Sequence, residues 1–380
     1  MEKNRLGLIV NPIAGIGGRV GLKGSDGIEI QNKALKLGAK PESICRAVKT
    51  LETILAMECD IELITYPEDM GGYAAEKCSF KHFVIGSIRR GETTADDTKK
   101  AARQMQQMNV DLILFAGGDG TARDIYDAVG GDVPVLGIPA GVKIQSAVFA
   151  TTPKAAGELA VLYLRGECTL KHAEVMDIDE DAVRRGVVSP KLYGYLLVPF
   201  EKSLVQGAKV PSGNGEAEAA EEIALRMAEI IKSDTKNIYI IGPGTTTKAI
   251  ASKMGIAKTL VGVDIVSEGK LIGVDVNEAQ ILKLIEGRSA KIVVTPIGGQ
   301  GFIFGRGNQQ ISPKVIKKVG RENIIVVATP GKINSLKGKP FLVDTGEEDV
   351  DHMLKGYIRV VTGYKDEAIY RVSDAIHAIN

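Results

Sequence analysis

A carboxylate inside a glycine loop is the part of this sequence best suited to chemistry. Residues 112–121 read LILFAGGDGT, so an apolar run ends in three glycines with Asp119 among them. Gly117, Gly118 and Gly120 are expected to take positive φ and to let the backbone approach phosphate, toward which the next helix points its N–H groups. A carboxylate repels phosphate unless it binds a proton, a cation or a substrate hydroxyl. The loop therefore predicts phosphoryl transfer, with Asp119 accepting the proton of the attacking hydroxyl or helping to place Mg²⁺.

The competing role for Asp119 is to cap the helix that follows the loop. Residues 121–124 read TARD, which fits the Ser/Thr-x-x-Asp/Glu capping pattern and makes Thr121 the expected N-cap. If Thr121 caps the helix, Asp119 remains available for catalysis. Thr121 is also predicted to belong to the nucleotide-binding loop.

Two more turns at the ends of expected strands are predicted to line the same cleft. Asn11 opens the segment NPIAG after the first apolar run, and LGIPAG ends at Gly141, with Lys143 two residues later. Asn-Pro and Pro-x-Gly are general turn signals, so ordinary loops and a solvated lysine are the alternative. Beside the glycine loop, Asn11, Gly141 and Lys143 are predicted to contact the nucleotide, with Lys143 meeting phosphate.

A further strand-to-helix junction in the C-terminal half also suits an anion. Residues 242–247 read GPGTTT, which supplies glycines and three hydroxyl groups. Gly244, Thr245 and Thr246 are therefore predicted to bind a phosphate, such as that of a sugar phosphate. The alternative is an ordinary helix start, which threonine caps well.

The loop at residues 298–310, GGQGFIFGRGNQQ, combines many glycines and amides. Such a loop is costly to order without a ligand, because glycine loses the most conformational freedom. Arg306 is predicted to hold a phosphate bidentately, while Gly301 and Asn308 belong to a surface that reads a base or a ribose.

Strands that alternate with helices are expected to position all these loops. Residues 96–109 and 216–232 have helical apolar faces, and the short Val-, Ile- and Leu-rich runs between helices read as buried strands. The strands expected before the turns are residues 6–10, 110–116, 133–138, 238–241 and 292–294, and a further one around Val326. Alternation of this kind indicates an α/β fold with a parallel sheet, whose ligands bind at the carboxyl ends of the strands.

We expect two domains with a cleft between them. Residues 1–150 form the predicted parallel-sheet domain with the GGDGT loop, and residues 151–340 form a second domain of mixed α/β content. Residues 341–380 are expected to form a C-terminal segment that returns to pack on the first domain.

Composition excludes several classes of protein. A net charge of +1 and 5% aromatic residues give no sign of a nucleic-acid or membrane partner. No apolar run is long enough to span a bilayer, and the four scattered cysteines suggest reduced thiols in the cytoplasm. The four histidines lie apart with no ligand spacing, so no protein metal site is identified. There is no GxxxxGK(S/T) or complete GxGxxG motif, which excludes a P-loop NTPase and the usual Rossmann fingerprint.

The motifs in combination resemble the NAD kinase and diacylglycerol kinase superfamily. GGDGT after an apolar strand, an Asn-Pro turn near the N-terminus and LGIPAG shortly afterwards carry the likeness. The segments GIPAGVKIQSAVFA, EVMDID, GPGTTT and TPIGGQGFIFGRGNQQ resemble the ATP-NAD kinase-like proteins of archaea and bacteria, including AcoX. The likeness covers most of the chain.

The resemblance implies a two-domain kinase with its active site in the interdomain cleft. ATP or inorganic polyphosphate would donate the phosphoryl group with Mg²⁺, and Asp119 would engage the 2′-hydroxyl of the adenosine ribose of NAD, giving NADP. Homo-oligomers are common among such kinases, so the resemblance also implies a homo-oligomer.

Departures from the family pattern keep other functions open. The Asn-Glu or Asn-Asp pair that contacts adenine in NAD kinases is absent from its expected place, where Glu174 and Asp177 lie. The C-terminal half also reads as alternating strand and helix rather than β-rich. One alternative is a kinase acting on another nucleoside, a sugar or a polyol; another is a non-catalytic regulator that binds a nucleotide or a sugar phosphate.

Overall fold

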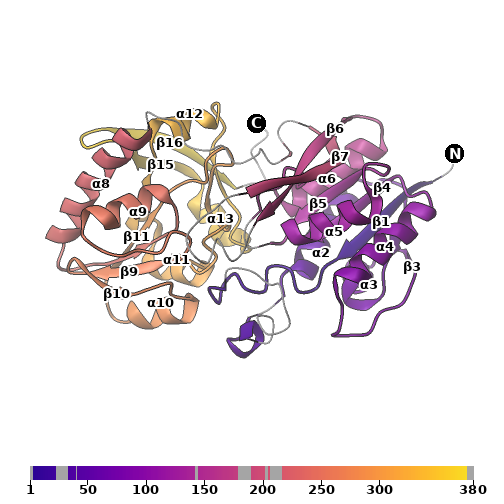
Figure 1. Cartoon of the computed structure of the whole chain (residues 1–380), viewed down its shortest axis with the longest axis horizontal. Helices are drawn as coiled ribbons and strands as arrows, with labels where there is room; N and C mark the ends of the chain where they lie inside the picture. Colours follow the sequence, from indigo (N-terminus) through magenta and orange to yellow (C-terminus); the bar gives the residue numbers. More distant parts are fainter. Residues whose placement is uncertain are drawn as a thin grey trace.

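The computed structural model describes residues 3–22, 33–39, 41–141, 144–178, 190–201, 204–205 and 216–374. The chain folds into two lobes that lie side by side, the N-terminal lobe on the right and the C-terminal lobe on the left of Figure 1. Each lobe is built around its own β-sheet.

The N-terminal lobe holds a five-stranded parallel sheet in the order β3-β2-β1-β4-β5. Its strands are β1 (Asn4–Val10), β2 (Ile61–Thr65), β3 (His82–Val84), β4 (Leu112–Gly117) and β5 (Val135–Pro139). β4 is buried along its whole length because it lies between two strands and is covered on both faces. The reversal of strand order between β1 and β4 is the kind of switch point at which open α/β sheets bind ligands.

Helices cover both faces of this sheet, because successive strand residues point to opposite faces. On one face, α2 (Ser43–Ala56) and α6 (Pro153–Leu164) pack in the same hydrophobic core as Leu8. On the other, α4 (Ala95–Gln107) and α5 (Asp119–Val129) pack in the same core as Phe115. Two further short helices of the lobe are η1 (Glu68–Met70) and α3 (Gly72–Lys77), and residues 33–36 are also helical. The helix expected at residues 96–109 is confirmed as α4, although Met108 at its end is exposed rather than buried.

The first domain extends beyond the predicted boundary at residue 150. α6 packs on α2, and the hairpin of β6 (Thr169–Ile178) and β7 (Pro190–Phe200) contributes Ala173, Val175, Leu196 and Val198 to the same core as Phe115. The first core thus reaches Val205, and the next core begins at Ile223 of the second lobe. The structure differs from the prediction because these segments bury apolar faces that the first sheet alone leaves uncovered.

The C-terminal lobe holds a mixed nine-stranded sheet in the order β10-β9-β8-β11-β13-β15-β16-β14-β12. β8, β11, β13 and β15 are parallel neighbours, whereas the β8–β9, β9–β10 and β15–β16 pairs are antiparallel. The strands are β8 (Ile238–Ile241), β9 (Asp264–Ser267), β10 (Lys270–Gly273), β11 (Ala290–Val294), β12 (Phe302–Phe304), β13 (Ile324–Val327), β14 (Phe341–Val343), β15 (Gly356–Val361) and β16 (Glu367–Asp374).

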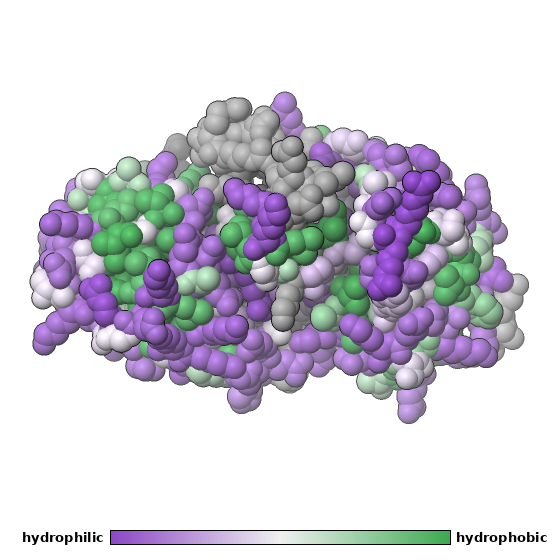
Figure 2. All heavy atoms as spheres, turned by 90° about the horizontal axis from the view of Figure 1, so that it is seen from below, coloured by the Kyte–Doolittle hydropathy of each residue, from purple (hydrophilic) through white to green (hydrophobic). Residues whose placement is uncertain are grey.

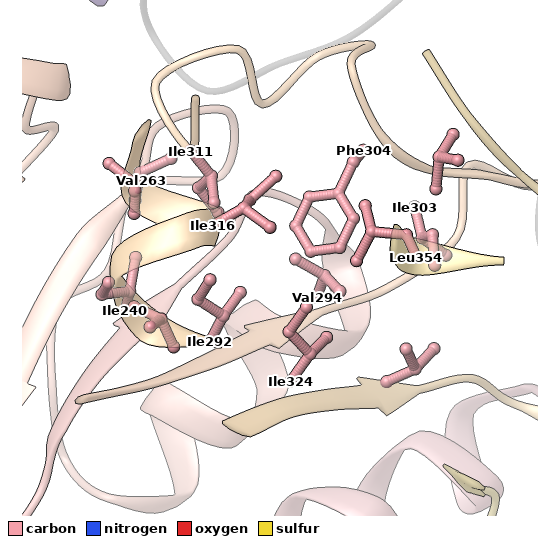
Figure 3. Packing of buried hydrophobic residues seen from close by; sticks show 14 of the residues in the cluster. Ile240, Val263, Ile292, Val294, Ile303, Phe304, Ile311, Ile316, Ile324 and Leu354 are labelled. Carbon is pink, nitrogen blue, oxygen red and sulfur yellow. The ribbon is translucent and has the colours of Figure 1, made fainter. Parts of the chain in front are cut away.

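Two hydrophobic cores lie on opposite faces of this second sheet. α8 (Glu216–Ser233) and α9 (Thr245–Lys253) cover one face, and Ile223, Met227 and Ile231 are buried there as the helical pattern predicted. On the other face, Ile316 of α11 lies over Ile292 and Val294, with Phe304 beside them (Figure 3). The helices not yet given bounds are α10 (Glu278–Leu284), α11 (Pro313–Val319), η2 (Arg321–Asn323), α12 (Pro330–Ser335) and α13 (Glu348–Leu354).

The C-terminal segment belongs to the second sheet. β14 pairs with β12 and β16, and β15 pairs with β13, so residues 341–374 complete the second domain instead of forming a separate segment on the first. Two ion pairs join them to α2 of the first domain, one through Asp344, just after β14, and one through Glu348, at the start of α13. Residues 375–380 lie outside the described part of the chain. The predicted fold class, a parallel-sheet domain followed by a mixed α/β domain, is confirmed.

Candidate functional site

Three loops meet at the carboxyl edge of the first sheet. The backbone N–H of Asn11, just after β1, donates to the carbonyl of Ala116 at 2.9 Å, and the N–H groups of Ala140 and Gly141, just after β5, both donate to the carbonyl of Gly117. The loops after β1, β4 and β5 therefore contact one another, and the prediction that they line one nucleotide cleft stays a prediction.

The glycines of these loops allow close contact between backbones. A Cβ atom on Gly141 would lie 2.7 Å from the Cα of Gly118, and one on Gly15 would lie 2.1 Å from the carbonyl oxygen of Ala140. The predicted positive φ at Gly117, Gly118 and Gly120 is wrong, because none of the three adopts it. Glycine is required at positions 118 and 141 by crowding between the two loops.

The helix after the glycine loop starts earlier than the capping pattern predicted. α5 begins at Asp119 with Gly118 as its N-cap, in an extended conformation, so the prediction that Thr121 is the N-cap is wrong. Thr121 lies in the first turn of the helix, and its Oγ1 accepts a hydrogen bond of 2.9 Å from Nδ2 of Asn11. The two residues tie the loop after β1 to the loop after β4.

Asp119 turns toward the loop that follows β5. Its Oδ2 accepts from the N–H of Gln145 at 2.8 Å, and its Oδ1 accepts from the N–H of Ser146 at 3.0 Å. Burial raises the pKa of the Asp119 carboxyl, while the hydrogen bonds from Ser146 and Gln145 and the charge of Arg123 oppose the rise. An ionised carboxylate has about four lone-pair sites, so the main-chain bonds from Gln145 and Ser146 and the side-chain bond from Ser146 leave room for about one further partner.

A loop of the second domain docks beside Asp119. Nε2 of Gln300 donates to the carbonyl of Ile144 at 3.3 Å, and Nη2 of Arg306 donates to the carbonyl of Thr151 at 2.5 Å. The Arg306 guanidinium also stacks over Phe302, 4.4 Å from the ring centroid. Burial lowers the pKa of Arg306 to about 10, and Asp119 lies close enough for its charge to oppose the shift. The loop therefore places a buried cation near the carboxylate.

The glycines and amides of this loop have structural partners. Gly301 and Gly305 both take positive φ, and a Cβ on Gly305 would lie 1.8 Å from the carbonyl oxygen of Asp344. Nδ2 of Asn308 donates to the carbonyl of Ile303 at 2.9 Å. Packing thus explains much of the unusual composition, and nucleotide contacts of Gly301, Arg306 and Asn308 stay a prediction.

A mostly buried ion pair joins the two domains next to Arg306. Nη1 of Arg46, on α2, lies 2.8 Å from Oδ2 of Asp344 and 3.0 Å from the carbonyl of Pro139. Burial alone would raise the pKa of Asp344, but the charges of Arg46 and Arg306 hold it below its usual value. Burial alone would lower the pKa of Arg46, but the attraction of Asp344 and Glu42 outweighs burial and raises this pKa. Both partners of the ion pair therefore remain charged.

A cavity of about 900 Å³ lies between the domains on the α2 side of this ion pair. Gly15, Arg46, Thr152 and Asp344 line it next to the glycine loops. Its outer walls carry apolar residues together with charges of both signs, including Arg19, Lys49, Lys154, Lys314, Glu42, Glu158, Glu278 and Glu348. The volume suits a nucleotide-sized ligand.

The carboxyl edge of the second sheet carries the GPGTTT turn. Gly244 takes a φ of 129° as the N-cap of α9, Thr245 is exposed, and Thr246 is buried. Oγ1 of Thr246 accepts a hydrogen bond of 3.0 Å from Nζ of Lys332. These residues belong to the second domain, and their role in binding stays a prediction.

Sequence patterns missed several charged residues of the cleft. Arg46 sits on a helix with no glycine turn, and Asp344 follows a short strand that reads as an ordinary loop. At the carboxyl edge of the second sheet, Lys332 could have been singled out from the sequence, because TPGK at residues 329–332 follows a strand in the same way as GPGTTT and TPIGG. Lys143 lies outside the residues that the structure describes.

A metal site made of protein side chains is not found among the described residues. No group of three or more His, Cys, Asp or Glu side chains there could hold a metal ion.

The helices in the described part of the chain show no membrane-spanning feature, because none of them is long and apolar enough to cross a membrane. On the face shown in Figure 2, hydrophobic side chains form separate patches among hydrophilic ones, and these patches do not join into one continuous band.

Two family models match the chain. The ATP-NAD kinase N-terminal domain matches residues 6–168, and the ATP-NAD kinase C-terminal domain matches residues 236–372. Comparison with curated proteins gives no match.

Solved structures give weaker likenesses. Two chains described as a "putative diacylglycerol kinase from Bacillus anthracis str. Sterne" are 16% and 15% identical, each with a TM-score of 0.25. The matches cover 47% and 63% of this chain and 47% and 60% of those chains, so this chain spans less than two thirds of their length. A UDP-N-acetylglucosamine 2-epimerase is 10% identical over 89% of this chain and 86% of its own, with a TM-score of 0.24.

Proposed function

The chain belongs to the ATP-NAD kinase family, and on that premise we propose that it phosphorylates NAD. The phosphoryl donor is ATP or inorganic polyphosphate, and the acceptor is the 2′-hydroxyl of the adenosine ribose, so the product is NADP. The subgroup that includes AcoX is part of this proposal.

One observation carries the proposal. Asp119 lies where the loops after β1, β4 and β5 meet, and the Gln300–Arg306 loop of the second domain closes over the segment that binds its carboxylate. A carboxylate at a phosphate loop, with a buried cation close by, suits transfer of a charged group to a neutral hydroxyl.

The chemistry assigned to Asp119 is that of a general base. The acceptor oxygen attacks the terminal phosphorus of the donor, the bond from that phosphorus to the donor's bridging oxygen breaks, and Asp119 takes the hydroxyl proton. Burial raises the pKa of Asp119, which makes it a better proton acceptor than an exposed carboxylate. Hydrogen bonds from Gln145 and Ser146 fix its orientation before the substrate binds.

The donor set fits a magnesium ion that is held mainly by substrate. The described residues offer no cluster of carboxylates or histidines for a metal, but Mg²⁺ is commonly bound by one or two carboxylates together with substrate phosphates and water. Asp119 is the carboxylate of the glycine loop that would hold it. When bound, the ion neutralises negative charge on the transferring phosphoryl group.

The acceptor is tested by a panel of substrates. Purified full-length protein is incubated with Mg²⁺, ATP or polyphosphate, and NAD, NADH, nucleosides, sugars or polyols, and the products are identified by mass spectrometry. Phosphorylated NAD supports the proposal. Phosphate on another acceptor alone replaces NAD and keeps the kinase, and nucleotide binding without any transfer contradicts the proposed activity and favours a regulator.

A further inference from the structure

A serine hydroxyl lies between strand β6 and the carboxylate of Asp119. Oγ of Ser146 accepts a hydrogen bond of 2.9 Å from the main-chain N–H of Met176, in β6. The same hydroxyl bonds to the carboxylate of Asp119, whose Oδ1 also accepts from the Ser146 N–H at 3.0 Å. Ser146 is fully buried, so its hydroxyl depends on protein partners. One side chain therefore connects β6 to the carboxylate proposed as the general base.

The two partners of the Ser146 hydroxyl fix the direction of its hydrogen atom. A main-chain N–H can only donate, so the Ser146 oxygen is the acceptor toward Met176. An ionised carboxylate can only accept, so the single O–H of Ser146 points at Asp119. The bond from Met176 thus orients the hydroxyl as a donor to the carboxylate.

The segment that carries Ser146 is held from two sides. On one side, the N–H of Ala147 donates to the carbonyl of Glu174, in β6, at 2.8 Å. On the other, Nε2 of Gln300, from the second domain, donates to the carbonyl of Ile144 at 3.3 Å. Ser146 lies between these two attachments along the chain. Both β6 and the second domain therefore help to determine where its hydroxyl lies.

Three hydrogen bonds limit how the Asp119 carboxylate can turn. The N–H of Gln145 bonds to Oδ2, the N–H of Ser146 bonds to Oδ1, and the Ser146 hydroxyl is a third donor. Because an ionised carboxylate has about four lone-pair sites, about one site remains open. A general base must hold this site within hydrogen-bond reach of the proton it takes, and a misplacement of about 1 Å can lower the rate about a hundredfold. Loss of the Ser146 hydroxyl would open a second site and let the carboxylate turn.

We propose that Ser146 is a positioning residue: its hydroxyl, oriented by Met176 of β6, directs the open acceptor site of the Asp119 carboxylate toward the hydroxyl group of the acceptor substrate. This inference rests on the proposed kinase activity. It gives β6 a role in turnover besides completing the first core. Ser146 acts through Asp119 and requires no contact of its own with the substrate.

The kinetics of Ser146→Ala test this role, with the donor and acceptor found by the substrate panel. The variant should lower kcat about five- to thirtyfold and change both KM values by less than about twofold, because the base is displaced while the binding surfaces are kept. Ser312→Ala is the matched control, since Ser312 is also buried and its hydroxyl also accepts a main-chain N–H, that of Val315. This control should keep kcat and both KM values near those of the wild type. A kcat of Ser146→Ala equal to that of the control, or a loss confined to KM, overturns the proposal.

A double-mutant cycle in stability shows whether Ser146 acts through Asp119, independently of turnover. Chemical denaturation compares the wild type, Ser146→Ala, Asp119→Ala and the double variant. Ser146→Ala should lower the denaturation midpoint more in the wild type than in Asp119→Ala, where no carboxylate accepts the hydroxyl. If transfer occurs but the two shifts are equal, the inference fails and the proposed function stands. If the two residues are coupled but no acceptor is phosphorylated, the hydrogen bond is structural only, and the positioning role fails together with the proposed function.

Discussion

The carboxyl edges of the two sheets use similar turns but are stabilised in different ways. At the first edge, backbone meets backbone: Gly118 lies against Gly141, and the carboxylate of Asp119 accepts hydrogen bonds from the main-chain N–H groups of Gln145 and Ser146. At the second edge, side chains bridge the turns, because Lys332 links Thr246 to Thr295. Glycine-rich turns after parallel strands therefore need not be built alike: main-chain N–H groups orient one carboxylate at the first edge, whereas side-chain hydrogen bonds hold the turns together at the second.

The contact between the two edges should give the largest effect on stability. Arg46→Met removes the partner of the mostly buried Asp344 carboxylate and should destabilise the protein by up to about 3 to 5 kcal/mol. Chemical denaturation measures the loss, and Lys49→Met, which removes an exposed ion pair with Glu348, is the control with an expected loss of about 1 kcal/mol or less.

The loss of stability caused by Arg46→Met should depend on pH. The folded-state pKa of Asp344 is lowered, so its ion pair contributes stability above the unfolded pKa of about 4, and this contribution is lost as pH falls through the folded value. The stability difference between wild type and Arg46→Met should therefore shrink in acid. A difference that is constant from pH 7 to pH 3 would show that the charge of Asp344 is not what Arg46 stabilises.

The first edge should tolerate no added side chain. Gly141→Ala places a methyl group 2.7 Å from the Cα of Gly118, which should cost about 1 to 3 kcal/mol and reduce activity, because the loop that binds Asp119 must shift. Gly131→Ala is the matched control, since its Cβ would meet nothing within 4 Å. Thermal unfolding and turnover of the two variants should separate clearly, and equal behaviour would mean that the first edge is not tightly packed.

The second edge should show a smaller effect on folding. Thr295→Val keeps the shape of the side chain and removes one hydrogen bond from Lys332, so the expected loss of stability is about 1 kcal/mol. A loss as large as that of Gly141→Ala would indicate that the second edge is a structural element like the first, and this would remove the contrast between them.

Sequence patterns predicted the local parts of this architecture better than its long-range contacts. Hydrophobic runs before glycine turns identified β1, β4, β5, β8, β11 and β13, and the 3.6-residue period identified α4 and α8. The patterns failed where distant packing decides the outcome: nothing local shows that α6 and the β6–β7 hairpin complete the first core, or that β14–β16 extend the second sheet.

The candidate site shows the same limit. The sequence singled out Asp119 and the loops around Asn11 and Gly141, and the structure brings these three together. The sequence did not reveal that Asp119 accepts hydrogen bonds from the N–H groups of residues 145 and 146, because a contact between residues 26 positions apart leaves no repeating pattern in the sequence. The pairing of Arg46 with Asp344, 298 positions apart, is hidden for the same reason.

Turnover of Asp119→Asn tests most directly whether phosphoryl transfer takes place at the GGDGT loop. With the donor and acceptor found by the substrate panel, Asp119→Asn should lower kcat by about two or more orders of magnitude. The control Asp127→Asn, on the exposed side of the same helix where it pairs with Lys99, should stay near wild type. Circular dichroism and thermal unfolding show whether Asp119→Asn still folds, because its amide N–H₂ faces a main-chain N–H. A folded Asp119→Asn protein with wild-type kcat would contradict the account.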